Sequence, residues 1–156
     1  MAADPLTVCL SLLKRRLRSR YELETAMTRK GIEAGDQERT LASLADKGLV
    51  DDLRYARAWI HTRDLLAPRG ASVLRQELTQ KGIAKSLIEQ VLNERKEEAA
   101  DECSEQPTDL DQARRLAQGK QRLYANLAPE VRHRRLGAFL QRRGFSYDVI
   151  RRILDE

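Results

Sequence analysis

Histidine and cysteine, the side chains that most often carry out chemistry, are few and isolated in this sequence. His61 and His133 have no cysteine or second histidine at the spacing of a zinc site. Cys9 falls in an apolar stripe and is expected to be buried, while Cys103 lies in an acidic segment with no group nearby to activate its thiol. The sequence also lacks a glycine-rich phosphate loop and a nucleophile elbow. We therefore expect no catalysis, no metal ion and no cofactor.

Two pairs of residues could still take part in chemistry, but structural roles suit them better. Asp51 and Asp52 could hold a metal ion in a nuclease, but adjacent residues of a helix point apart, so a helix N-cap is the better interpretation. Tyr55 and Trp59 could stack on nucleic-acid bases, but Trp59 lies in an apolar stripe, which favours packing in the core. Neither pair predicts an enzyme.

Charge is the more informative feature, because it is segregated along the chain. The 156 residues carry a net charge of +5 at pH 7. Three basic segments have net charges of +4 (1–30), +5 (53–96) and +7 (113–156), and the acidic segments between them have −4 (31–52) and −7 (97–112). Such blocks are typical of a surface that meets phosphates or acidic protein at several places. Arginine pairs are concentrated in the last basic segment, and arginine suits two-point contacts to oxyanions.

One sequence motif occurs three times and sets the expected architecture. Each copy has a leucine, a methionine or leucine four residues later on the same helix face, then a Lys/Arg-Gly pair and a large apolar residue. The glycine stands where a helix would end in a left-handed residue. The copies are LETAMTRKGI (23–32), LRQELTQKGI (74–83) and LGAFLQRRGF (136–145). The structural positions, to which Trp59 is added, are Leu23, Leu74, Leu78, Leu136 and Leu140, with Gly31, Gly82 and Gly144.

Further apolar stripes precede and follow each copy at helical spacing, so each copy is the centre of a three-helix unit. In the first unit the last stripe is displaced by four residues, which predicts a turn four residues longer around Glu33–Asp36. The expected N-caps of the helices that open the second and third units are Asp51 or Asp52, and Thr108 or Asp109.

The predicted fold is therefore all-α, with three tandem three-helix repeats stacked into an elongated, curved array that has no deep pocket. The low aromatic content of 4% agrees with helices rather than a β-sandwich. A stacked array with polar ends is expected to be a monomer. The expected divisions are repeat 1 over 1–50, repeat 2 over 51–96 with its third helix extending toward 100, an acidic connector over 97–108, and repeat 3 over 109–156.

Composition also bears on location. No apolar run approaches the roughly 20 residues of a membrane span, and the N-terminal residues lack the order of a secretory signal. The two cysteines do not build a disulfide framework, which fits a reducing compartment. We expect a soluble protein of the cytoplasm without membrane association.

Three segments, taken in order, closely resemble the bacterial RecX family. The segments are GLVDDLRYARAWIHTRD (48–64), PRGASVLRQELTQKGI (68–83) and LQRRGFSYDVIRRIL (140–154). Within and before them, the matching residues are Ser19, Glu22-Leu23, the Gly-Leu-Val-Asp-Asp turn, Tyr55-Ala56, Arg69-Gly70 and the Glu-Leu-x-x-Lys-Gly-Ile run at 77–83. The departures are an acidic insertion at 97–111 and a non-aromatic Ile32 where the last copy has Phe145.

The resemblance implies a tandem array of helix-turn-helix-like units that regulates the recombinase RecA. RecX proteins bind the helical groove of the RecA–DNA filament and reduce its strand exchange, ATP hydrolysis and coprotease activity, in homologous recombination, DNA repair and the SOS response. The implied partners are the RecA filament and, weakly and without sequence preference, single- or double-stranded DNA.

Exposed cations of the middle and last units are the candidate partner contacts, because a body lying in the filament groove would meet acidic protein and phosphate. They are Arg57, Arg63, Arg69, Arg75, Lys81, Arg134, Arg135, Arg142 and Arg143. The main alternative is a helix-turn-helix regulator that acts on DNA directly, since basic three-helix units also describe that class. A metal-dependent nuclease is the third interpretation.

Overall fold

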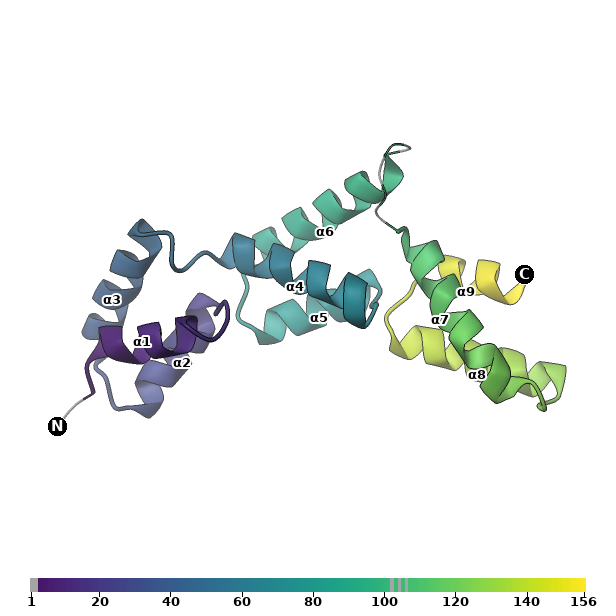
Figure 1. Cartoon of the computed structure of the whole chain (residues 1–156), viewed down its shortest axis with the longest axis horizontal. Coiled ribbons are helices and arrows are strands. Elements are labelled where there is room, and N and C mark those ends of the chain that lie inside the picture. The colour runs from purple at the N-terminus through teal and green to yellow at the C-terminus, as the bar shows by residue number, and fades with distance from the viewer. Residues whose placement is uncertain (1–2, 102, 104, 106) are drawn as a thin grey trace. The chain divides into compact units, whose positions relative to one another are not determined.

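The computed structural model describes residues 3–101, 103, 105 and 107–156, and these residues form nine α-helices and no β-strand (Figure 1). The helices follow one another along the chain in threes, which confirms the predicted all-α fold of tandem three-helix repeats. Residues 102, 104 and 106 of the predicted acidic connector, and residues 1–2 of the predicted repeat 1, lie outside the described residues. The helices are α1 (Pro5–Leu13), α2 (Arg20–Arg29), α3 (Ala34–Asp46), α4 (Asp52–Leu66), α5 (Ala71–Gln80), α6 (Lys85–Ala100), α7 (Asp109–Tyr124), α8 (Pro129–Arg142) and α9 (Tyr147–Leu154).

The chain divides into two compact units. Unit 1 comprises Met1–Ala58 and Leu78–Ile88, and unit 2 comprises Trp59–Glu77 and Glu89–Glu156. Unit 1 therefore contains the first three helices and the turn from α5 to α6, whereas unit 2 contains the last three helices with most of α5 and α6. Each unit thus includes one contact between consecutive repeats.

In unit 1, α1, α2 and α3 pack against one another around a small apolar core. Its centre consists of side chains that are completely buried: Cys9, Leu23, Met27, Leu41 and Leu44. Full burial of each large apolar side chain stabilises the fold by about 1.5–3 kcal/mol. The raised pKa of the Cys9 thiol follows from this burial, which keeps the thiol protonated and inert.

The third helix of the first repeat corrects one prediction. The expected turn four residues longer around Glu33–Asp36 is wrong, because α3 already begins at Ala34 and the connection before it is no longer than in the other repeats. The additional residues form a polar first helical turn, in which the Gln37 side-chain amide donates to the carbonyl oxygen of Ile32 (2.8 Å). The three equivalent connections are residues 30–33, 81–84 and 143–146.

The second helix of every repeat ends in a left-handed glycine. Gly31, Gly82 and Gly144 have φ angles of +72°, +74° and +88°, and the amide of the next residue donates to a carbonyl five residues earlier. The residue after each glycine is a buried apolar side chain, so the cap also turns the chain back toward the core. An alanine in this conformation costs about 1 kcal/mol in backbone strain alone.

In unit 2, α7, α8 and α9 pack around a second apolar core. Thr108 is the N-cap of α7, where its hydroxyl accepts the backbone N–H of Asp111 and the Asp111 carboxylate accepts the backbone N–H of Thr108. In unit 1, the equivalent N-cap at the start of α4 is Asp51, whose carboxylate accepts the backbone N–H of Arg54 (3.0 Å). The core residues of the third repeat are Ala113, Ala117, Phe139, Leu140, Phe145, Ile150 and Ile153.

Consecutive repeats meet through one recurring contact, which we term the repeat joint: the N-terminal end of the second helix of one repeat packs on the glycine cap of the next. In unit 1 the Ser19 hydroxyl donates to the carbonyl oxygen of Lys81 (2.7 Å). A Cβ built on Gly82 would lie 2.2 Å from the Cβ of Tyr21, so only glycine permits this approach.

Unit 2 contains the equivalent repeat joint between the second and third repeats. The backbone N–H of Gly70 donates to the carbonyl oxygen of Arg143 (2.8 Å), and the Ser72 hydroxyl donates to the carbonyl oxygen of Gly144 (3.0 Å). A Cβ built on Gly70 would lie 2.1 Å from the carbonyl oxygen of Gly144. By contrast, a Cβ built on Gly31, the cap of the first repeat, meets no atom of the described residues beyond its chain neighbours within 4 Å.

Candidate functional site

The described residues offer little material for a metal centre. Among residues 3–101, 103, 105 and 107–156, no group of three or more His, Cys, Asp or Glu side chains is placed to hold a metal ion. Over the same part of the chain, no helix combines the length and apolar character needed to cross a membrane. The nine cations predicted from the sequence form the candidate site, and they differ in how freely they could meet a partner.

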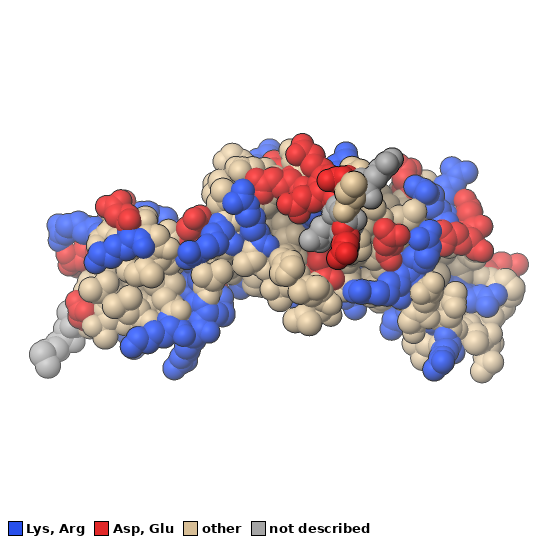
Figure 2. Space-filling view, turned by 45° about the horizontal axis from the view of Figure 1, so that its top comes forward, with Lys and Arg blue, Asp and Glu red and all other residues tan. Residues whose placement is uncertain are grey.

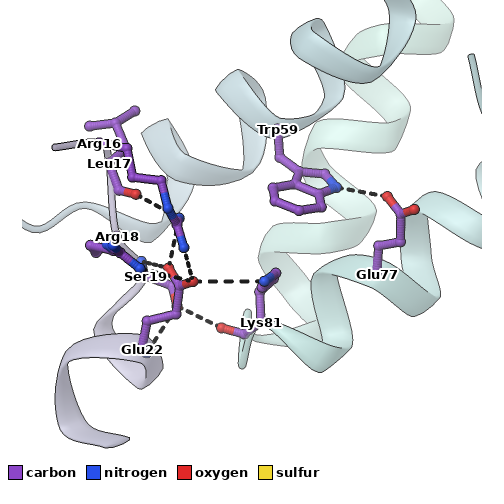
Figure 3. Close-up of polar contacts among 8 residues, drawn as sticks. All are labelled: Arg16, Leu17, Arg18, Ser19, Glu22, Trp59, Glu77 and Lys81. Atoms are coloured by element: carbon purple, nitrogen blue, oxygen red, sulfur yellow. Dashed lines mark hydrogen bonds and ion pairs between the residues drawn. The ribbon is translucent and has the colours of Figure 1, made fainter. Parts of the chain in front are cut away.

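Two of the nine cations are held by one carboxylate. Glu77 of α5 lies at 2.9 Å from Nε of Arg63 and 3.8 Å from Nε of Arg69. It also accepts the indole N–H of Trp59 (2.8 Å), as Figure 3 shows, and the Arg63 guanidinium lies 4.9 Å from the indole centroid. Trp59 is half-buried. This position lets its indole N–H reach the Glu77 carboxylate, since an indole N–H that leaves water needs a polar acceptor. The same contacts explain why a glutamate interrupts the apolar stripe of the middle repeat.

Two further cations of the middle repeat also form ion pairs. Arg75 makes a two-point contact with Glu89, at 2.7 Å and 3.2 Å, and the hydrogen bond raises the pKa of the guanidinium. Lys81 lies 3.7 Å from the Glu22 carboxylate. Arg57 is exposed on α4. A partner that took up the paired cations would have to compete with their existing carboxylates.

The last repeat presents its cations more openly. Arg134, Arg135 and Arg142 of α8 are exposed and form no ion pair with any residue that the structure describes. Arg143 differs, because it is half-buried with its guanidinium 5.2 Å from the Phe139 ring, and its carbonyl oxygen accepts the Gly70 N–H. On the face drawn in Figure 2, Lys and Arg side chains are spread over the surface and in many places lie next to Asp and Glu side chains.

A further set of cations was missed by the sequence reasoning, which took its candidates from the middle and last units. The run Lys-Arg-Arg-Leu-Arg-Ser-Arg at 14–20 connects α1 to α2 and places five cations within seven residues. Lys14 and Arg15 are exposed and have no ion pair within the described residues. Arg16 and Arg18 turn toward Glu22, at 2.8 Å and 3.9 Å (Figure 3). The density of basic residues was the available signal.

Glu22 is the electrostatic centre of this cluster. Its carboxylate accepts the backbone N–H of Ser19 (3.1 Å) as part of the N-cap of α2, so its position is fixed by the helix start. Burial raises the pKa of Glu22, but the hydrogen bonds from Arg16 and Ser19 and the charges of Arg16 and Lys81 outweigh it, so the pKa lies below its ordinary value. The carboxylate therefore stays ionised and holds the surrounding cations together.

The comparisons with known proteins agree with this arrangement of repeats. Three family models, for the first, second and third three-helix domains of RecX, match residues 6–44, 51–92 and 108–154 in that order. The Regulatory protein RecX of Mycolicibacterium smegmatis is 35% identical over 96% of this chain and 82% of its own length. This chain belongs to the RecX family.

Other RecX proteins extend the comparison. The Regulatory protein RecX of Leuconostoc citreum is 32% identical over 98% of this chain, but the chain spans only 54% of the length of that relative. The crystal structure of RecX from Lactobacillus salivarius has a TM-score of 0.81 at 23% identity and is covered over 92% of its chain. A second crystal structure of a regulatory protein RecX has a TM-score of 0.83 at 25% identity, over 99% of this chain and 73% of that one. The relatives are named as regulators, which supports a regulatory role for this RecX chain.

Proposed function

We propose that this RecX chain binds the RecA–DNA filament and inhibits the recombinase, ATPase and coprotease activities of RecA, in DNA repair and the SOS response. The observation that carries the proposal is the ordered match to all three RecX three-helix domains along one chain. We further propose that the chain acts in the cytoplasm as a monomer and has no catalytic activity.

Inhibition by occupancy fits the polar contacts of the molecule. A helical body bound in the filament groove would occupy the space that a second DNA strand or a repressor substrate needs. Contacts to acidic protein or to phosphate require cations that are not already neutralised. On this criterion Arg134, Arg135 and Arg142 of α8 are the foremost contacts. The cations paired with Glu77 and Glu89 contribute less, because each would first have to leave a carboxylate.

Titration of the protein into preformed RecA filaments, with ATP turnover as the readout, tests the proposal. Wild type should lower turnover, and the triple variant Arg134→Gln, Arg135→Gln, Arg142→Gln should need roughly tenfold more protein for the same effect, at about 0.5 kcal/mol for each exposed contact. The matched control replaces Lys47, Arg54 and Lys85 by glutamine, which removes the same charge at exposed positions outside these contacts.

The possible outcomes separate the alternatives. Equal loss of inhibition in the α8 variant and in the control would show that net charge, not the α8 cations, matters. Unchanged ATP turnover with wild type, together with tight binding to one duplex sequence in the absence of RecA, would replace the proposal by a helix-turn-helix regulator of DNA. Cleavage of DNA in the presence of magnesium would instead identify a nuclease.

A further inference from the structure

Unit 1 contains a groove of about 340 Å³ beside the basic run of the first repeat. Residues along the length of α2, with the end of α1, form one wall, and the end of α5 with the start of its glycine cap forms the other. The side chains that matter for binding are three cations, Arg18, Arg29 and Lys81, one acid, Glu22, and one aromatic ring, Tyr21. We name this feature the Glu22 groove.

The Glu22 groove carries more positive charge than its single acid can neutralise. Three cationic nitrogens converge on one oxygen, Oε1 of Glu22: Nη2 of Arg16 at 2.8 Å, Nζ of Lys81 at 3.7 Å and Nη1 of Arg18 at 3.9 Å (Figure 3). Arg29 adds a further exposed cation that makes no ion pair within the described residues. The surplus charge favours an anionic ligand.

Arg18 supplies a donor that the protein leaves unused. Its Nε is buried, and no hydrogen-bond acceptor for it occurs among the described residues. A buried guanidinium N–H without an acceptor is costly, and an oxyanion that entered the groove would satisfy it. The groove is therefore lined by an arginine whose hydrogen-bonding capacity the described residues do not use fully, and it carries a surplus of positive charge.

An aromatic ring stands beside these cations. Tyr21 is 51% exposed, which is unusual for a large side chain at a packed contact between repeats. Its Cβ is fixed against Gly82 by the repeat joint, so the ring is anchored at its base while much of its surface stays open. An anchored ring next to phosphate-binding cations is the arrangement that takes a base and its adjoining phosphate from a single strand.

We infer that the Glu22 groove binds single-stranded nucleic acid, with a phosphate at Arg18 and Lys81 and an unpaired base against Tyr21. A duplex would not present a free base to the ring, and an acidic peptide would use the cations but not require the ring. This binding site would add to the proposed function. It rests on that function only for the source of the strand, which would be the DNA of the filament.

Fluorescence anisotropy with a labelled oligothymidylate, in the absence of RecA, tests this site. Tyr21→Ala keeps the Cβ that packs against Gly82 and removes the exposed ring, so affinity should fall about tenfold while its salt dependence stays unchanged. Lys81→Gln should reduce the slope of log affinity against log salt by about 0.7, the value for one lost phosphate contact on a single strand. Lys47→Gln, an equal loss of charge at an exposed position elsewhere in unit 1, should leave affinity within about twofold of wild type.

Three results would overturn the inference. The first is equal affinity of Tyr21→Ala and wild type, with both shown by circular dichroism to be folded. The second is a duplex of the same length that binds as tightly as the single strand. The third is full competition by polyglutamate at equal charge, which would assign the groove to acidic protein. Since the assay contains no RecA, any of these results leaves the ATP-turnover test of the proposed function intact.

Discussion

The repeat joint of unit 2 can be broken by a single methyl group, at Gly70. The Cβ of Gly70→Ala would lie 2.1 Å from the carbonyl oxygen and 2.2 Å from the carbonyl carbon of Gly144, and 2.5 Å from the backbone nitrogen of Phe145. All three are backbone atoms, so no side chain can rotate away. The second and third repeats must therefore separate at this point.

The cost follows from the hydrogen bonds that separation removes. The Gly70 N–H to Arg143 bond (2.8 Å) and the Ser72 hydroxyl to Gly144 bond (3.0 Å) both cross the joint. At about 1 kcal/mol each, their loss weakens the joint by roughly 2 kcal/mol, which corresponds to about 30-fold in the equilibrium for its opening. Gly70 lacks a positive φ, so the backbone itself adds no strain at this position.

Native-state hydrogen exchange provides the assay. In the Gly70→Ala variant, exchange of the amide at position 70, whose N–H crosses the joint, should become about 30-fold faster than in the wild type, while exchange in the core of α1–α3 stays unchanged. The matched control is Gly119→Ala, because a Cβ at this helical glycine meets no atom within 4 Å in the part of the chain that the structure describes, apart from the backbone of its own helix. That control should be neutral or stabilising by up to about 1 kcal/mol. Equal exchange rates in Gly70→Ala and wild type would show that Gly70 does not lie in a tight contact with the third repeat.

The other predictions concern single contacts. Gly82→Ala should lower the free energy of unfolding more than Gly31→Ala, which costs about 1 kcal/mol. Of these two positions, Gly82 is the one where the new Cβ would also meet a side chain, at 2.2 Å. Urea unfolding compares the two variants, and equal losses of stability would contradict the tight contact at the repeat joint. Arg95→Met should cost about 3 kcal/mol by leaving the mostly buried Asp64 unpaired, and adding Asp64→Asn should restore most of it. Because the pKa of Glu22 is lowered in the fold, its carboxylate stabilises the protein above the unfolded pKa of about 4.3, and this contribution is lost as the pH falls through the folded value. Glu22→Gln should therefore be less stable at pH 7 and lose less stability on acidification, and parallel pH profiles of the two proteins would disprove this.

Sequence patterns within single helices and their caps were sufficient to predict the all-α fold class. The leucines four residues apart and the Lys/Arg-Gly pair that follows them act within one helix and its cap, and such short-range signals survive without knowledge of tertiary contacts. The same reasoning failed at α3, where a displaced apolar stripe was interpreted as a longer turn. Its extra residues are helical because Gln37 closes the turn with a side-chain hydrogen bond, and polar residues give no periodic signal.

The candidate site was less accessible to sequence reasoning. Whether an arginine or a lysine can bind a partner depends on acids that are distant in the sequence. Arg63 pairs with Glu77, fourteen residues later, and Lys81 pairs with Glu22, on another repeat. The repeat joints could not be predicted either, because they join residues that are distant in the sequence. In addition, Ser19 and Gly70 make equivalent contacts although their side chains differ. The roles of the α8 cations and of the Glu22 groove remain predictions for experiment.

Co-sedimentation with RecA filaments tests whether this RecX chain binds the filament. Filaments formed on single-stranded DNA with a non-hydrolysable ATP analogue would be pelleted after mixing with increasing amounts of this RecX chain. We expect saturable recovery of the chain in the pellet, reduced in the triple variant of Arg134, Arg135 and Arg142 and retained in the charge-matched control. A chain that stays in the supernatant at every filament concentration would contradict it.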